Sequence, residues 1–201
     1  MQLPKLPPIG VFHTIPTTEQ LSVLDLLFEP SPALHTLLLD RHDTLRTPFS
    51  SYPDLIEHVS SAIRSLLAEN SPDATTAATN TATLHAILGS HPRLGAKKVE
   101  SAQSAAEQAR LQQGAEEERV ELARLNHAYE AAFPGLRYVV FVNGRGRPEI
   151  MLDMRARIVR GDIAAEERTA IQVCMCVYGL FIVLFATIYG LHWSLSLTHI
   201  Q

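Results

Sequence analysis

Apolar residues recur every three or four positions along much of the chain, which is the spacing of amphipathic helices. A first helix is predicted from Thr17, because Thr17 and Gln20 are spaced as the two ends of a capping box. Pro30 ends this helix, and Pro32 suits the first turn of a second one. A third helix is predicted over residues 52–67. The inward positions of these helices are Leu21, Leu24, Leu27 and Phe28, then Leu34, Leu37 and Leu38, then Leu55, Ile56, Val59, Ile63 and Leu66.

Two segments of the first half lack this spacing. Residues 1–16 carry Pro4, Pro7 and Pro8 and no continuous apolar stretch, so we predict an extended lead-in that is not a targeting signal. Residues 69–83 are dominated by Ala, Thr and Asn, and we predict a surface loop of low complexity.

Further helices are predicted over residues 101–113, 116–133 and 149–159. Residues 137–142 are β-branched and aromatic but have no second strand to pair with, so we predict an extended segment there. Its unpaired backbone groups would be available to a ligand. The fold class is therefore all-α: a compact multi-helix domain over residues 17–172 with one extended segment. The inward positions of the last two helices are Val120, Leu122, Leu125 and Tyr129, then Ile150, Met151, Met154 and Ile158.

Composition excludes some classes of protein. The chain has 201 residues, of which 46% are hydrophobic, and its 17 Lys and Arg are outnumbered by 21 Asp and Glu. Nucleic acid is therefore not an expected partner. Cys174 and Cys176 are too close in sequence to bridge each other, so no disulfide framework is predicted. The histidines show no spacing typical of a metal site.

The charges are distributed unevenly. No Asp, Glu, Lys or Arg follows Arg168, and residues 173–193 are uncharged and mostly apolar. This run is predicted to be a hydrophobic C-terminal helix, long enough to cross a bilayer, within a charge-free tail over residues 173–201. A buried terminal helix is disfavoured by the length of the run and its lack of a polar face. Two interpretations stay open: the tail is a genuine membrane anchor that leaves the domain in the cytosol, or it is a translated intron or splice variant, because Val173-Cys174 can be encoded by a sequence like an intron donor site.

One block carries candidate chemistry. Pro92 restricts His91 to an extended conformation and suits the first position of a helix, so His91 is expected at the mouth of that helix. An imidazole titrates near neutral pH and can hold or give a proton. In the helix predicted over residues 101–113, Ser104, Glu107 and Gln108 stand at i, i+3 and i+4 and project from one side.

An ordered set of motifs resembles the 2-oxo-4-hydroxy-4-carboxy-5-ureidoimidazoline (OHCU) decarboxylases, which perform the last step from urate to (S)-allantoin. The resemblance extends from Leu21 to Gln172. The matching motifs are His91-Pro92-Arg93-Leu94-Gly95, Ser104 with Glu107-Gln108, Leu125-Asn126-His127-Ala128-Tyr129 with Phe133, and Tyr138-Val139-Val140-Phe141-Val142.

The resemblance implies a carboxy-lyase of purine catabolism that needs no cofactor and no metal. It makes His91 the proton donor and Glu107 the residue that orients His91 or polarises the substrate. It also implies a small-molecule ureidoimidazoline substrate and a homodimer. The remaining residues implied to bind substrate are Pro92 in the pocket wall, Ser104 and Gln108 through their side chains, and Val139, Val140, Phe141, Val142 and Asn143 through their backbone.

One part of the family pattern is missing. Family members continue with a final helix that ends in an arginine that binds the substrate's anionic group, whereas this chain has no Lys or Arg after Arg168. The alternative to an active decarboxylase is therefore an impaired or inactive helical interaction module, either tethered to a membrane by its tail or produced by intron retention. A genuine anchor places the chain at a membrane; otherwise a cytoplasmic or peroxisomal location is expected.

Overall fold

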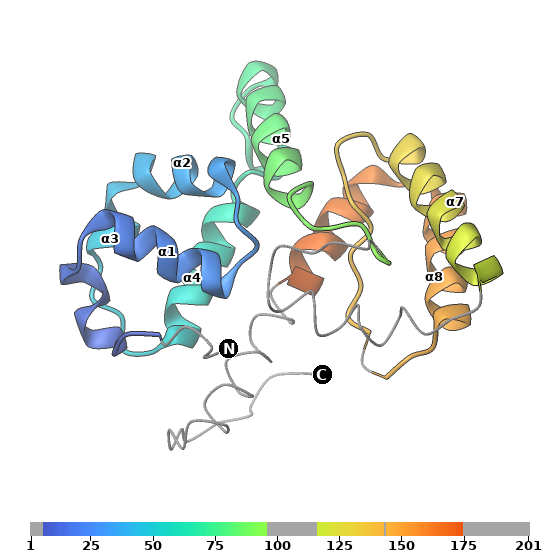
Figure 1. Ribbon diagram of the computed structural model, residues 1–201. Coiled ribbons are helices and arrows are strands. Elements are labelled where there is room, and N and C mark those ends of the chain that lie inside the picture. The colour runs from blue at the N-terminus through green and yellow to red at the C-terminus, as the bar shows by residue number, and fades with distance from the viewer. Residues whose placement is uncertain (1–5, 96–115, 143, 175–201) are drawn as a thin grey trace, which may run out of the picture.

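The computed structural model describes residues 6–95, 116–142 and 144–174, which are helices joined by loops and contain no β-strand, so the all-α prediction is confirmed (Figure 1). In chain order the elements are η1 (Ile9–Thr14), α1 (Thr17–Leu27), α2 (Pro32–Asp40), α3 (His42–Arg46), α4 (Tyr52–Arg64), η2 (Ala68–Asn70), α5 (Ala74–Leu88), α7 (Glu116–Ala132) and α8 (Arg147–Arg160). A last helix occupies residues 163–174. The predicted helix over residues 101–113 lies outside the described residues.

The helices of the first half begin where serine and proline occur together. Ser31 and Ser51 accept hydrogen bonds at the starts of α2 and α4, and a proline follows in the first turn of each helix. The capping box predicted for α1 is wrong, because Pro16 occupies the N-cap position. Gln20 is instead buried, and its side-chain amide donates to the carbonyl oxygens of Phe12 and Leu45 at 2.7 and 2.6 Å.

Part of the predicted extended lead-in also belongs to the domain. The 3-10 helix η1 contacts α3 and places Phe12 in the core with no exposed surface. Before it, the carbonyl oxygen of Pro7 accepts a hydrogen bond of 2.6 Å from the hydroxyl of Tyr52. The prediction for residues 1–16 is therefore wrong for residues 9–14, because an apolar residue inside this proline-rich stretch completes the core.

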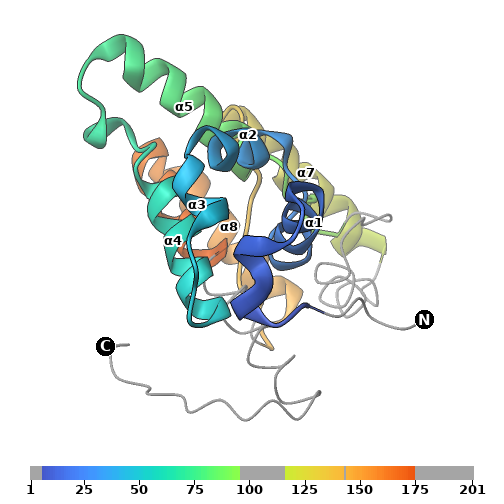
Figure 2. The same ribbon diagram turned by 90° about the vertical axis from the view of Figure 1, so that its left-hand side faces the viewer.

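The loop predicted over residues 69–83 is wrong as well. η2 and α5 occupy most of it, and the N-cap of α5 is Asp73, whose carboxylate accepts from the backbone N–H groups of Thr75 and Thr76 at 2.9 Å. Threonine hydroxyls along the helix donate to carbonyl oxygens one turn earlier, as Thr79 does to Thr75. Only the C-terminal end of α5 is buried, and its first turns project beyond the other helices in two perpendicular views (Figure 1, Figure 2).

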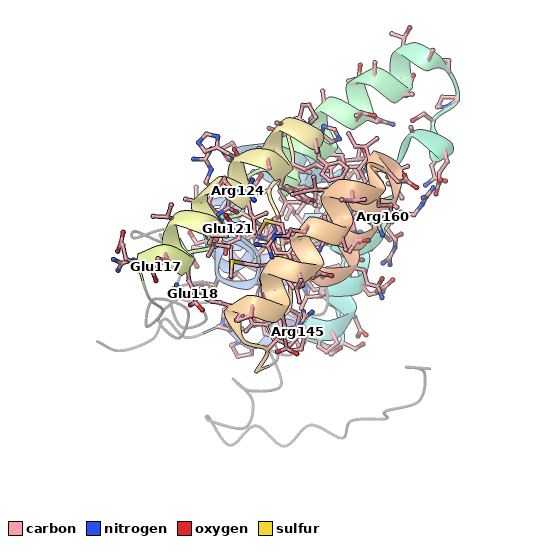
Figure 3. The ribbon with its side chains drawn as sticks, turned by 90° about the vertical axis from the view of Figure 1, so that its right-hand side faces the viewer. Glu117, Glu118, Glu121, Arg124, Arg145 and Arg160 are labelled. Carbon is pink, nitrogen blue, oxygen red and sulfur yellow. The ribbon has the colours of Figure 1, made fainter. Side chains whose placement is uncertain are left out.

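α7 and α8 pack side by side and begin at the same end of the molecule (Figure 3). Residues 136–142 lead from the end of α7 back toward the start of α8 without helix or strand, which confirms the predicted extended segment over residues 137–142. Most predicted inward positions of the two helices are buried, but Val120 is 61% exposed. Arg157, which was not among those positions, is buried on the inner face of α8.

The helix over residues 163–174 shares one hydrophobic core with α1–α5 and with α7 and α8. Ala170, Ile171 and Cys174 are buried in the same core as the apolar residues of α1–α5, α7 and α8. The domain therefore continues through the first two residues of the predicted tail. Within the described residues no helix is long and apolar enough to cross a membrane. Residues 175–201 lie outside the description, and the anchor stays a prediction.

Candidate functional site

His91 lies in the loop that follows α5. The helix ends at Gly89, whose backbone N–H donates to the carbonyl oxygen of His85 at 2.7 Å, and the hydroxyl of Ser90 donates to that of Ile87 at 2.6 Å. Residues 92–95 are not helical, so the prediction that Pro92 begins a helix is wrong. His91 is held by the end of the preceding helix instead.

Two glycines allow the extended segment to approach this end of α5. A Cβ atom on Gly89 would lie 2.7 Å from the carbonyl oxygen of Gly135. Gly135 has a φ of +90°, and a Cβ atom there would lie 2.9 Å from Nδ1 of His85. Side chains at these two positions would separate residues 134–136 from the helix that carries His91.

The loop after His91 is fixed to α7 by two contacts. The guanidinium of Arg93 donates from Nε and Nη2 to the two carboxylate oxygens of Glu130 at 2.6 and 2.5 Å, and these hydrogen bonds lower the pKa of Glu130. The side-chain amide of Asn126, which is buried, donates to the carbonyl oxygen of Leu94 at 3.0 Å. The loop over residues 91–95 is thus held by the end of α5 before it and by α7 after it.

The last helix packs against α5 and against His91 itself. Nε2 of His85 lies 2.7 Å from a carboxylate oxygen of Glu167, and Nε2 of His91 lies 2.8 Å from Sγ of Cys174. The side chain of Cys174 is buried. Since the tail was predicted to begin at Val173, this contact was not foreseen from the sequence.

Burial controls the protonation of His91. Removal from solvent disfavours the charged imidazolium and lowers the pKa of His91 to about 4. A small cavity of about 10 Å³, room for about one water molecule, lies beside the ring. Its walls are mainly apolar, with Phe28, Leu34 and Ile171 among them, but they also include the buried carboxyl group of Glu29. At neutral pH the ring of the unliganded protein is therefore uncharged.

The extended segment is oriented by a buried ion pair that the sequence analysis missed. Arg157 donates from Nη1 to the carbonyl oxygen of Val139 at 3.1 Å and from Nη2 to Glu166 at 2.7 Å. Glu166 is fully buried and also accepts from the hydroxyl of Tyr129 at 2.6 Å. Burial alone would lower the pKa of Arg157, but the hydrogen bonds and charge of Glu166 reverse that effect and raise it. Arg157 is therefore a fixed cation.

Some backbone carbonyl groups of this segment already accept hydrogen bonds from other groups of the protein. The carbonyl oxygen of Val139 is bonded to Arg157, and that of Val142 accepts from the backbone N–H of Arg145 at 2.8 Å. The side chain of Arg145 also donates to the carbonyl oxygen of Phe141. The prediction of available backbone groups is thus wrong for these three carbonyl oxygens.

The structure brings together only part of the predicted site. His91 has a defined place, with Pro92 beside it in the loop, but Pro92 does not line the small cavity. Val139, Val140, Phe141 and Val142 do not line it either. Ser104, Glu107, Gln108 and Asn143 lie outside the described residues. Among the described residues no group of three His, Cys, Asp or Glu side chains is arranged to hold a metal ion.

A comparison with protein families agrees with the motifs. The profile of the OHCU decarboxylase family matches residues 13–177, which is most of the chain. The match begins within η1 and continues past Gln172, where the resemblance read from the motifs ends. No curated protein matches the sequence.

Proposed function

Because the chain belongs to the OHCU decarboxylase family, we propose that it converts OHCU to (S)-allantoin and that His91 supplies the proton. The observation that carries this proposal is the place of His91: an imidazole in the family's His-Pro motif, fixed by α5 on one side and by α7 on the other. A rigidly held proton donor suits a reaction in which one face of an intermediate must be protonated.

The chemistry needs one proton and one stabilised negative charge. Cleavage of the bond to the carboxylate releases carbon dioxide and leaves an electron pair that delocalises into the imidazoline ring. His91 then delivers a proton to one face, which sets the configuration of the product. No cofactor is required, provided that hydrogen-bond donors stabilise the developing charge.

The low pKa of His91 in the unliganded protein bears on this mechanism. A neutral ring must gain a proton before it acts as an acid, and the negative charge of a bound carboxylate favours the imidazolium form. We expect kcat/KM to fall as pH rises through the neutral range, because this constant reports protonation of the free protein. A flat profile there would contradict His91 as an acid that is charged before the reaction.

A direct assay tests the activity. Freshly prepared OHCU is added to the purified chain, and the circular dichroism of (S)-allantoin is followed with time. We expect a rate well above the uncatalysed one and a loss on the order of 100-fold or more in His91→Gln. His35→Gln is a matched control, because His35 is also partly buried and hydrogen-bonded, in its case to Asp25 at 2.7 Å.

The same assay decides between enzyme and inactive module. A wild-type rate equal to the uncatalysed one shows that this chain is not a working decarboxylase and favours the interaction module. An active wild type whose rate is unchanged in His91→Gln would keep the reaction but remove His91 as the donor.

A further inference from the structure

A second cavity of about 290 Å³ shares no lining residue with the small cavity beside His91. It is bounded by residues 93–95, by α7 and by the start of α8. Figure 3 shows that the two helices begin at the same end of the molecule. The charged side chains on its walls are Arg93, Arg119 and Arg147, and among the described residues no Asp or Glu lines it.

Two N–H donors of the Arg147 guanidinium lack an acceptor among the described residues. Its side chain is only 6% exposed, and neither Nε nor Nη1 has a hydrogen-bond partner in the described part of the chain. The carboxylate of Glu118 lies 3.9 Å from Nη1, which is beyond hydrogen-bond distance. Buried guanidinium groups normally have their N–H donors satisfied, so an acceptor with negative charge fits this position.

The other two arginines of the cavity are already engaged. Arg93 forms the paired hydrogen bonds with Glu130, and Arg119 pairs with Glu116 on the same face of α7. The charge of each is therefore balanced by a carboxylate, whereas Arg147 still has donors to offer. Such an arrangement selects a small anion over a neutral ligand.

We propose that this cavity binds a small oxyanion, the carboxylate or phosphate group of a metabolite, with Arg147 as its hydrogen-bonding partner. Planar guanidinium groups recognise both kinds of oxyanion through paired N–H donors. The cavity is large enough for a small molecule. The site is distinct from that of His91, and because residues 93–95 line it directly after His91-Pro92, its occupancy would act on the loop that holds the proton donor.

Thermal unfolding tests this site without any turnover. The melting temperature of the full chain is measured in phosphate, in malonate and in chloride at equal ionic strength, for wild type, Arg147→Met and Arg124→Met. Arg124 is the matched control, because it is an exposed arginine of α7 that pairs with Glu121 and does not line the cavity. We expect phosphate or malonate to raise the melting temperature of wild type and Arg124→Met but not of Arg147→Met. The oxyanion that acts at the lower concentration identifies the preferred class.

The melting temperature of Arg147→Met in chloride separates an anion-binding role of Arg147 from a purely structural one. Replacement of a buried cation whose N–H donors are unsatisfied by an apolar side chain of similar length leaves stability unchanged or raises it, so we expect Arg147→Met in chloride to melt no lower than wild type. A lower melting temperature in chloride, an anion-dependent rise retained in Arg147→Met, or no rise in wild type with either oxyanion would each overturn the proposal. None of these results depends on decarboxylase activity.

Discussion

Acidification should destabilise the fold through His91. The pKa of this ring is about 4 in the folded chain, against about 6.5 in an unfolded chain. Between these values the unfolded chain binds a proton that the folded chain does not, so stability falls as pH is lowered. The contribution of the neutral ring is fully present above about pH 6.5 and is lost progressively toward pH 4.

The size of the effect follows from the two pKa values. Each unit between them corresponds to about 1.4 kcal/mol, so the whole loss is about 3 kcal/mol once the pH is below both values. At about pH 5 roughly 2 kcal/mol of this has been lost. That is a sizeable part of the free energy of unfolding of a small domain, which is roughly 5–15 kcal/mol.

The measurement is urea unfolding of wild type and His91→Gln at about pH 7.5 and about pH 5. Other titrating groups contribute to both proteins and cancel in the comparison, because glutamine keeps a polar side chain at the position but does not titrate. We expect the free energy of unfolding to fall by roughly 2 kcal/mol more in wild type than in the variant. Equal losses within about 0.5 kcal/mol would refute the burial argument for His91.

Three further substitutions test the framework of the site by urea unfolding. Glu166→Gln should cost about 3–5 kcal/mol, because it leaves the buried guanidinium of Arg157 without its countercharge, and a loss below about 1 kcal/mol would contradict this role. Asp73→Ala should cost about 1 kcal/mol through loss of the α5 N-cap, whereas Asp73→Asn should cost little. Gly135→Ala should lower the free energy of unfolding clearly more than Gly144→Ala does. Both glycines have a positive φ, but only at Gly135 would the new Cβ meet other atoms. Equal losses would show that this close approach is unimportant.

The helices with regular apolar spacing could be predicted from the sequence because burial determines them. Residues such as Leu24, Leu55 and Ile150 recur at helical intervals and are all buried. A helical turn over residues 84–88, ended by Gly89, could be predicted, but the first ten residues of α5 were missed because they have few large apolar side chains and several threonines, which have low helix propensity. Asp73 three residues before Thr76 was a usable N-cap signal that the preceding Pro72 obscured.

The site was predicted less completely, for a different reason. The position of His91 followed from a local motif, but its contact with Cys174 joins residues 83 positions apart. Such a contact depends on tertiary packing that spacing along the chain does not encode. Arg157 did leave a signal, since it lies three residues after Met154 on the apolar face of α8. A charged residue on an inward face indicates a buried partner, here Glu166.

The late position of the last helix affects how the domain forms during translation. Ala170, Ile171 and Cys174 complete a core whose other members come from as early as Phe12. While the ribosome still holds residues 163–174, the apolar end of α5 lacks its cover, and so does His91. Chains that expose such surface are prone to aggregate, and chaperones bind them. We therefore expect the nascent chain to remain incompletely folded until residue 174 has left the exit tunnel.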